Sequence, residues 1–409
     1  MHLLIATPYF PSAVDPGAGS FIRRQALALA RRGHRVEILH IQPRPPALWR
    51  RAPRWRLRTS LPEHEVHDGL AVYRAYYPST TQRRPLWRFQ AAAIAHGVTR
   101  ALARHPELGA VDALYAQWLV PFGWGCLRAA RRAGIPCLAI ARGADLNLWG
   151  RRRALRRQLL ALVEQVDALL GNGEWVRPAL ARAAGGDPGR PVDVVYNPCD
   201  LSPFFALDRD DTALRAAVRA RLGLPHDAPT VLFVGQLAAR KGPDVAVEAI
   251  ARLGPPWQLL LAGTGELEAS LRAQVARAGA TGCVRFLGAV PHDRLPGLMA
   301  ACDVLAVPSR REGLPNALVE GLAAAMPVVA AAVGGSTELV HPGRTGWLVA
   351  PDAPHALAAA LADLRAHPAS ARACGAAGRA LVRTRFDVAA NAARLEAIVA
   401  RLGRRRASG

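Results

Sequence analysis

Lysine is almost absent from this sequence: of 53 basic residues, all but Lys241 are arginines. Cysteine is scarce too, and the six cysteines form no C-x-x-C pair, so neither a disulfide framework nor a zinc knuckle is indicated. Long apolar runs are also missing. The most apolar stretch, ALVEGLAAAMPVVAAAVGG, carries Glu320 and is interrupted by Pro327, which argues against a membrane-spanning helix.

The length and composition indicate a globular protein of two domains. The chain has 409 residues, more than one ordinary core accommodates. Hydrophobic residues make up 51% and charged residues 21%, as in globular proteins. The opening stretch MHLLIATPYFP has a short apolar run and no basic leader, so we expect no signal peptide and a cytoplasmic location.

Positive charge is concentrated in the first half of the chain. Residues 1–200 hold 29 arginines against 14 acidic residues, and the formal net charge of the chain is +22. RPPALWRRAPRWRLR (44–58) and WGRRRALRRQLLALV (149–163) combine arginines with large apolar residues. Such segments are typical of surfaces that lie on anionic lipid, and a solvated face is the alternative. We expect an anionic membrane surface as a partner and a place on the inner face of the membrane. We expect no nucleic acid, because no binding motif supports that third interpretation.

Strand and helix patterns alternate regularly from residue 230 onward. Apolar runs such as TVLFVG, WQLLLAG and DVLAVPS are separated by helical patterns such as DVAVEAIARLG and NALVEGLAAA. This alternation predicts a parallel sheet covered on both faces. The first half contains similar apolar runs, namely HLLIATPY, HRVEILH and IPCLAIA. The predicted fold class is α/β, with two doubly wound, Rossmann-like domains that face a central cleft.

The segment YNPCDLSPFFALDRDD, residues 196–211, shows no hydrophobic period and has several turn-forming residues. We interpret it as a hinge linker between a domain at 1–195 and a domain at 212–385. Ligands are expected at the carboxyl ends of the strands of both domains.

Two glutamates eight positions apart follow a predicted strand end. Glu312 lies on a loop, and Glu320 lies on a helix for which we expect Asn316 as the N-cap. The first amides of that helix, together with its dipole, make an anion site suited to phosphate. Glu320 can accept hydrogen bonds from a vicinal diol such as a ribose, and Glu312 from the hydroxyls of a second sugar. Two surface glutamates without a role are the alternative.

Lys241 lies in the loop VGQLAARKG, between the strand end at Gly235 and a helix. Its compact ammonium suits a diphosphate leaving group that gains charge as a bond breaks, a place that a guanidinium fork does not always fit. Chance retention of one lysine is the alternative.

The stretches VGQLAARKG, LAGTGEL, VRFLGAVP, CDVLAVPSRREGLPNALVEGLAAAMPVVAAAVGGSTELV and GRTGWLV occur in one order along the second half. In this the sequence resembles the retaining glycosyltransferases of family four, which have the GT-B fold. In the first half, YFPSAVDPGAGSFIRRQALALARRGHRV is similar to the family's opening glycine loop and helix. ARGADLN (141–147) is similar to its acceptor-side segment.

The resemblance implies an enzyme that moves a sugar, with retention, from a nucleotide-diphosphate sugar to a lipid-linked saccharide in cell-surface polysaccharide biosynthesis. It implies no metal and no cofactor. The domain at 1–195 becomes the acceptor-side domain, the domain at 212–385 binds the nucleotide sugar, and residues 386–409 form a helix that packs back toward the first. Lys241 and Glu312 are the expected catalytic residues, on the diphosphate and the transferred sugar. Donor binding is also implied for Gly17, Gly19, Gly235, Gln236, Arg240, Gly263, Val290, Gly313, Leu314, Pro315, Asn316 and Glu320.

Two positions depart from the family pattern. Gln236 stands where many members have an arginine, and Arg240 is the candidate to supply the missing charge. Arg142 stands where many members have a histidine, before Gly143 and Asp145 on the acceptor side. Arg142 either meets an acidic or phosphorylated acceptor or forms a structural salt bridge with Asp145.

A dinucleotide-dependent oxidoreductase is a competing interpretation, because Gly17 and Gly19 follow the first strand and Glu37 stands 20 positions past Gly17. Two requirements of the dinucleotide-binding motif are not met. Ile22 stands where the third glycine belongs, and Glu37 lies in the middle of a predicted strand.

Three other classes stay open. They are a nucleotide-sugar epimerase of the same architecture, a pyridoxal phosphate enzyme with Lys241 as the Schiff base, and a non-catalytic sugar-nucleotide sensor.

Overall fold

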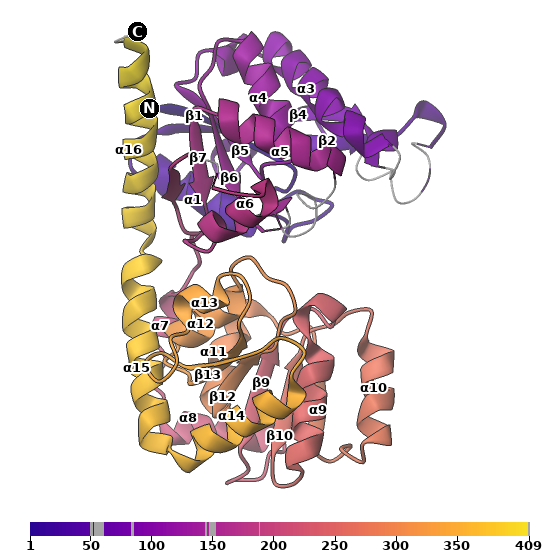
Figure 1. Ribbon diagram of the computed structural model, residues 1–409, viewed down its shortest axis with the longest axis vertical. Helices are drawn as coiled ribbons and strands as arrows, with labels where there is room; N and C mark the ends of the chain where they lie inside the picture. Colours follow the sequence, from indigo (N-terminus) through magenta and orange to yellow (C-terminus); the bar gives the residue numbers. More distant parts are fainter. Residues whose placement is uncertain are drawn as a thin grey trace. The chain divides into compact units, whose positions relative to one another are not determined.

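The computed structural model describes residues 1–49, 52, 61–82, 86–143, 145–146, 153–187 and 189–407. The chain forms two compact units (Figure 1): unit 1 comprises Met1–Cys199 and Phe386–Gly409, and unit 2 comprises Asp200–Arg385. The chain leaves unit 1 within the segment expected as a hinge linker, and it returns to unit 1 for its last helix.

Unit 1 is built on an eight-stranded sheet in the order β3-β4-β2-β1-β5-β6-β7-β8, counted over the described residues. All neighbours pair in parallel except β3 and β4, which form a hairpin. The strands are β1 (His2–Thr7), β2 (Arg35–Arg44), β3 (His64–His67), β4 (Leu70–Pro78), β5 (Ala113–Gln117), β6 (Cys137–Ala141), β7 (Ala168–Gly171) and β8 (Val192–Val194). The helices are α1 (Ser20–Arg31), η1 (Ala47–Trp49), η2 (Ser79–Gln82), α3 (Trp87–Arg104), η4 (Pro106–Gly109), α4 (Phe122–Arg132), α5 (Arg153–Gln165), α6 (Val176–Ala184) and α16 (Val388–Ala407).

Both faces of this sheet are buried, which is why its strands are continuous apolar runs. Side chains alternate across the pleat, so Leu4 and Ala6 enter one core and Leu3 and Ile5 the other. The first core includes side chains of α3, α4, α5 and α6, and the second includes those of α1 and α16. Figure 1 shows α16 beside the N-terminus of the chain.

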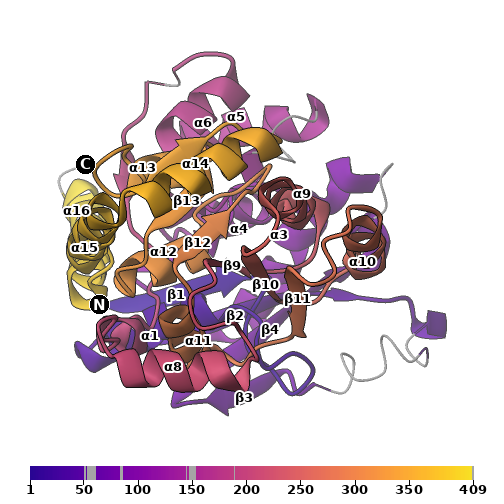
Figure 2. The same cartoon turned by 90° about the horizontal axis from the view of Figure 1, so that it is seen from below.

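Unit 2 contains a six-stranded parallel sheet in the order β11-β10-β9-β12-β13-β14. The strands are β9 (Thr230–Val234), β10 (Gln258–Ala262), β11 (Val284–Gly288), β12 (Val304–Val307), β13 (Val328–Ala331) and β14 (Trp347–Val349). The helices are α7 (Ser202–Phe205), α8 (Thr212–Arg221), η6 (Ala239–Lys241), α9 (Pro243–Leu253), α10 (Glu268–Arg277), η7 (His292–Arg294), α11 (Leu295–Ala301), α12 (Asn316–Ala323), α13 (Ser336–Leu339), α14 (Pro354–Ala366) and α15 (Pro368–Arg385). Helices α9 and α14 lie on one side of this sheet and α8 and α11 on the other (Figure 2).

The predicted α/β class with two Rossmann-like domains is confirmed. No helix in the described ranges is long and apolar enough to cross a membrane. All six cysteines are buried and free. Most of the basic segment 44–58 and the beginning of 149–163 lie outside the described residues.

Candidate functional site

The loops that follow β9 and β12 meet where the strand order of the sheet in unit 2 reverses. These two strands are parallel neighbours, and the chain order reverses between them: β10 and β11 continue on one side, β13 and β14 on the other. In open parallel sheets, ligands bind outside the carboxyl ends of the strands at such a reversal. Both loops carry residues that the sequence predicts as functional, Lys241 after β9 and Glu312 after β12.

Lys241 and Glu312 form an ion pair between Nζ and Oε1. Ser309 Oγ donates a further hydrogen bond to the same carboxylate oxygen, at 3.0 Å. The lysine side chain is 18% exposed and the glutamate side chain 7%. A ligand can therefore reach the ammonium, whereas the carboxylate is nearly enclosed. Two residues that are 71 positions apart in the sequence are thus in direct contact.

Arg310 ties the two loops together. Its guanidinium donates to both carboxylate oxygens of Asp244, at 2.8 and 2.6 Å, and to the carbonyl oxygen of Ala239, at 2.7 Å. Its backbone N–H also donates to the carbonyl of Arg240, at 2.9 Å. The hydrogen bond to Asp244 raises the pKa of Arg310 above its ordinary value. The turn that carries Lys241 is thereby fixed to the β12 loop.

The same two loops approach so closely that one position must be glycine. Gly242 has φ +67°, and a Cβ there would lie 2.1 Å from the carbonyl oxygen of Pro308. Both the backbone conformation and the space exclude a larger residue.

Helix α12 begins at Asn316, so the expectation that Asn316 is its N-cap is wrong. Pro315 holds the N-cap position with φ −71° and ψ 117°, close to the φ of about −65° that the proline ring imposes. Asn316 is thereby displaced into the first turn. In the described part of the chain, no side chain caps the helix. Its first amides therefore remain available to an anion.

The loop before α12 is fixed by its neighbours. Leu314 is buried, and the carbonyl of Gly313 accepts a hydrogen bond from the N–H of Gly335. These contacts keep the amides at the beginning of α12 in a defined position.

Glu320, one turn into α12, lies 3.1 Å from Nε2 of His292, measured from its Oε1. The glutamate side chain is 10% exposed and the imidazole 43%. His292 begins η7, two residues after Val290, and its ring packs edge-on against Phe204 at a centroid distance of 5.3 Å. His292 was not predicted from the sequence, because its only signal is its place two residues after Val290, for which the resemblance implies donor binding.

Arg240 and Gln236 contact each other. Arg240 Nη2 donates to Gln236 Oε1 at 2.7 Å, and both side chains are exposed. The glutamine thus holds a guanidinium beside the position where the resembled family carries arginine. Gly235 and Gly263 directly follow the adjacent strands β9 and β10, and Gly235 donates its N–H to the carbonyl of Ala262 at 3.0 Å.

The strand order of unit 1 also reverses, between β1 and β5. Gly17 and Gly19 lie in the loop after β1. Gly19 has φ +63° directly before α1, and a Cβ there would lie 2.2 Å from the carbonyl oxygen of Tyr9, so only glycine fits. At Gly17 a Cβ would meet only the Asp15 carboxylate, at 3.9 Å.

Arg142 follows β6, where its guanidinium is enclosed by polar and aromatic groups. Nε donates to Gln117 Oε1 at 3.0 Å, and Nη1 donates to Asn197 Oδ1. The guanidinium carbon lies 4.5 Å from the centre of the Phe21 ring and 5.9 Å from that of Trp118. Burial lowers the pKa of Arg142 to about 10, so it keeps its charge at neutral pH.

Asp145 does not form a side-chain salt bridge with Arg142 in the described residues. Its carboxylate instead accepts the N–H groups of Leu119 at 3.0 Å, Arg142 at 3.1 Å and Gly143 at 2.8 Å. Burial raises the pKa of Asp145, an effect that these hydrogen bonds oppose. Asp145 therefore orders the backbone of two loops, and Arg142 is left to contact other groups.

Comparison with known proteins decides the family. Residues 17–203 match the family described as Glycosyltransferase Family 4, and residues 215–381 match Glycosyl transferases group 1. The D-inositol 3-phosphate glycosyltransferase of Mycobacterium tuberculosis is 33% identical over 367 residues, which cover 85% of this chain and 71% of that protein. The chain belongs to glycosyltransferase family 4.

Other glycosyltransferases are similar over nearly the full length. TuaC of Bacillus subtilis, named for teichuronic acid biosynthesis, is 26% identical over 88% of each chain. The structure of HepE from Anabaena in complex with UDP matches with a TM-score of 0.72 and 22% identity, covering 98% of this chain and all of that one. In the described part of this family 4 glycosyltransferase, no group of three or more His, Cys, Asp or Glu side chains could hold a metal ion.

Proposed function

We propose that this glycosyltransferase moves a sugar, with retention of anomeric configuration, from a nucleotide-diphosphate sugar to a lipid-linked saccharide in cell-surface polysaccharide biosynthesis. The observation that carries the proposal is the Lys241–Glu312 pair beside the uncapped end of α12, with Glu320 one turn further on. Two relatives support it. HepE has been solved with UDP and with UDP-glucose, and TuaC is named for teichuronic acid biosynthesis.

The donor's charges match this end of unit 2. The diphosphate binds to the Lys241 ammonium and to the first backbone N–H groups of α12. These groups stabilise the negative charge that develops as the bond to the sugar breaks. The proposal needs no metal ion and no cofactor. Glu320 accepts hydrogen bonds from the ribose diol, and Glu312 from hydroxyls of the transferred sugar. Arg240, held beside Gln236, supplies a second positive charge.

Retention is assigned to the leaving group rather than to a carboxylate nucleophile. Glu312 is already bound to Lys241 and Ser309 and is nearly enclosed, a poor position for attack. In the proposed step the bond from the sugar carbon to the diphosphate oxygen breaks and a bond to the acceptor oxygen forms. The proton of the acceptor hydroxyl passes to the departing diphosphate.

The acceptor side is proposed at the loops of unit 1 around Arg142. A guanidinium that keeps its charge at neutral pH and lies over an aromatic ring suits an acidic or phosphorylated acceptor. The relative from Mycobacterium tuberculosis carries a phosphorylated compound, D-inositol 3-phosphate, in its name. The basic first half of the chain is proposed to bring the enzyme to the anionic inner face of the membrane, where lipid-linked acceptors lie.

The test begins with the donor. Nucleotide sugars are screened for a rise in melting temperature, because a ligand that binds only the folded state stabilises it. The donor found is then incubated with lipid-linked saccharides, with and without EDTA, and the anomeric configuration of the product is read by NMR. We expect transfer with retention, also in EDTA. A changed sugar without any acceptor would identify an epimerase, and binding without turnover a sensor.

Glu320→Ala should act chiefly on donor binding. Loss of hydrogen bonds between a carboxylate and the ribose is expected to raise the donor KM about tenfold at nearly constant kcat. Steady-state kinetics in the donor concentration measure this. Glu248→Ala, which removes an exposed glutamate paired with Arg252 on α9, is the control. A fall in kcat alone would contradict the ribose role.

A further inference from the structure

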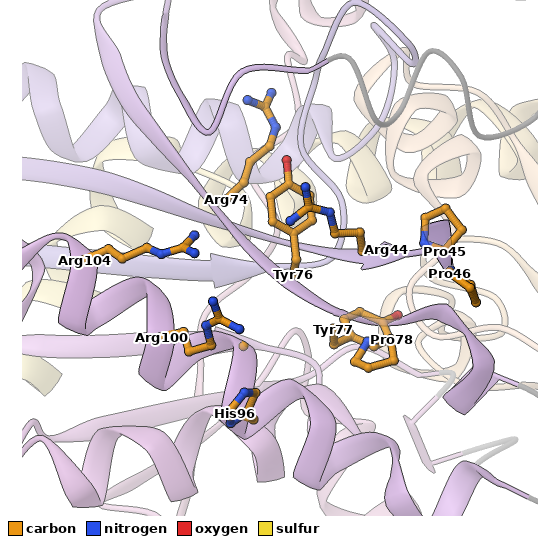
Figure 3. A pocket seen from close by; sticks show the side chains of 11 residues that line it. Arg44, Pro45, Pro46, Arg74, Tyr76, Tyr77, Pro78, His96, Arg100 and Arg104 are labelled. Atoms are coloured by element: carbon orange, nitrogen blue, oxygen red, sulfur yellow. The ribbon is translucent and has the colours of Figure 1, made fainter. Parts of the chain in front are cut away.

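The outer edge of β4 is only partly covered by β3. Pairing between the two strands runs from His67–Leu70 to His64–Tyr73. Beyond Tyr73, the described residues place no further strand on that edge. Helix α3 passes over the strand so closely that a Cβ at Gly97 would lie 2.3 Å from the carbonyl oxygen of Tyr76. A cavity of about 360 Å³ remains between β4, α3 and the end of β2 (Figure 3).

Basic side chains line this cavity from three elements. Arg44 comes from the end of β2 and Arg74 from β4. His96, Arg100 and Arg104 are four positions apart on α3, a spacing that places them on one face of the helix. In Figure 3 the Arg100 and Arg104 head groups extend into the same space.

Two of the four arginines already have acidic partners. The buried side chain of Arg74 pairs with Glu65, and Arg104 lies 3.4 Å from Glu63. These glutamates, just before and within β3, neutralise two positive charges.

Arg44 and Arg100 keep their charges uncompensated, since neither has an acidic partner among the residues that the structure describes. Arg44 lies over the Tyr76 ring, with 4.9 Å from the guanidinium carbon to the ring centre. Burial raises the pKa of Tyr76, so its hydroxyl stays protonated and can donate a hydrogen bond. The cavity thus offers two free guanidinium groups and a neutral donor.

We propose that this cavity is a binding site for a phosphate group. Guanidinium groups bind phosphate through paired N–H donors, and the cavity volume lies within the range of about 300–1,000 Å³ found for ligand sites. The phosphate belongs either to a lipid headgroup or to a free phosphate ester. The site lies apart from Lys241 and Arg142 in sequence, goes beyond the proposed transfer reaction and does not depend on it.

The experiment measures binding by the full chain without any donor. The probes are inorganic phosphate, followed by calorimetry, and vesicles of phosphatidylcholine with or without phosphatidic acid, followed by cosedimentation. Arg100→Ala and Arg44→Ala should each weaken binding about fivefold, the effect expected for one basic residue near an anionic surface. Arg100→Lys keeps the positive charge but not the paired N–H donors of the guanidinium, so it should weaken binding less than Arg100→Ala does.

Arg182→Ala is the matched control. Arg182 is likewise exposed on a helix of unit 1, α6, and lies outside the cavity. Its removal should change binding less than twofold. Because Arg100 has no ion-pair partner in the described residues and alanine is the better helix former, Arg100→Ala should melt as the wild type does.

The outcomes separate the sources of the phosphate. Binding to phosphatidic acid vesicles that inorganic phosphate does not displace assigns the cavity to a lipid headgroup. Binding of inorganic phosphate that competes with the vesicles assigns it to phosphate esters in general. Equal losses in Arg100→Ala and Arg182→Ala would show a diffuse basic surface and overturn the proposal, as would the absence of binding to every probe. Failure of the transferase assay would leave these measurements unaffected.

Discussion

The single lysine and the buried Arg219 make different kinds of contact in this molecule. Arg219 is buried and donates to three carbonyl oxygens, those of Ala301, Pro225 and Ala228, at 2.8, 2.6 and 2.7 Å. A planar fork with five donors suits such a place. Lys241 instead directs one compact ammonium at Glu312 from a tight turn. The geometry gives a physical reason why arginine does not replace it.

Lys241→Arg should lower kcat by more than tenfold although the charge is conserved. The larger guanidinium has to fit between the η6 turn and the nearly enclosed Glu312 carboxylate. Its N–H donors are therefore placed differently from those of the ammonium, and they stabilise the charge that develops on the diphosphate less well. Turnover with saturating donor measures this, and Arg252→Lys, which also conserves the charge of an exposed residue on α9, is the control. Activity near that of the wild type would remove the argument from ammonium geometry.

Single residues could be predicted where the residue type and the neighbouring sequence were enough to indicate a role. Lys241, Glu312 and Glu320 stand out by type and by their place after strands, although their roles stay predictions. Asn316 was assigned to the wrong helix position because the conformation of the preceding proline decides where α12 begins. His292 was missed because its partner Glu320 is 28 positions away, a distance that no local pattern bridges.

At the scale of elements, the stretches predicted as strands and helices in unit 2 agree with β9, β10, β12, α9 and α12 to within two residues, since buried parallel strands are short apolar runs. The β3–β4 hairpin was not predicted. Its signal is the pair Asp68-Gly69, whose φ values of +50° and +79° both lie in the left-handed region. An Asp-Gly pair between two strand segments is a recognised hairpin turn, and charged residues in β3 concealed the apolar pattern.

Gly242→Ala should weaken the link between the loops after β9 and β12. The added Cβ meets the Pro308 carbonyl oxygen and also forces an unfavourable φ. Gly134→Ala is the matched control, since Gly134 has φ +68° and open space around it. We expect the control to lose about 1 kcal/mol of stability and Gly242→Ala at least about 1 kcal/mol more, with loss of donor binding. Chemical denaturation measures both, and equal losses would argue against a close approach of the two loops.

At the scale of the whole molecule, unit 1 is completed only by the last segment of the chain. Side chains of α16, among them Leu395 and Ile398, are buried in the core that also contains Leu3 and Ile5. Glu396 on the same helix accepts hydrogen bonds from Arg32 and lies 2.8 Å from His34 Nε2. The first strand of the chain and its last helix therefore stabilise each other.

Glu396→Gln should remove an acid-sensitive part of this stability. The hydrogen bond from Arg32 lowers the pKa of Glu396 from 4.5 to about 2. A lowered pKa stabilises the folded state above pH 4.5, and the contribution is lost as the pH falls through about 2. Urea unfolding should show wild type more stable than the variant by at most about 1 kcal/mol at pH 6, and equal to it near pH 2. Glu248→Gln, in an exposed pair, is the control; a difference that persists at pH 2 would contradict this assignment.

Beyond Tyr73, the outer edge of β4 has no strand partner among the residues that the structure describes. An unpaired strand edge offers its backbone to any other strand, and exposed edges are where soluble proteins begin to aggregate. Here Arg44 from β2 and Arg100 from α3 line the cavity next to this part of β4. Two copies that paired edge to edge at this part of β4 would bring the uncompensated charges of Arg44 and Arg100 close together, so we expect these two arginines to oppose self-association.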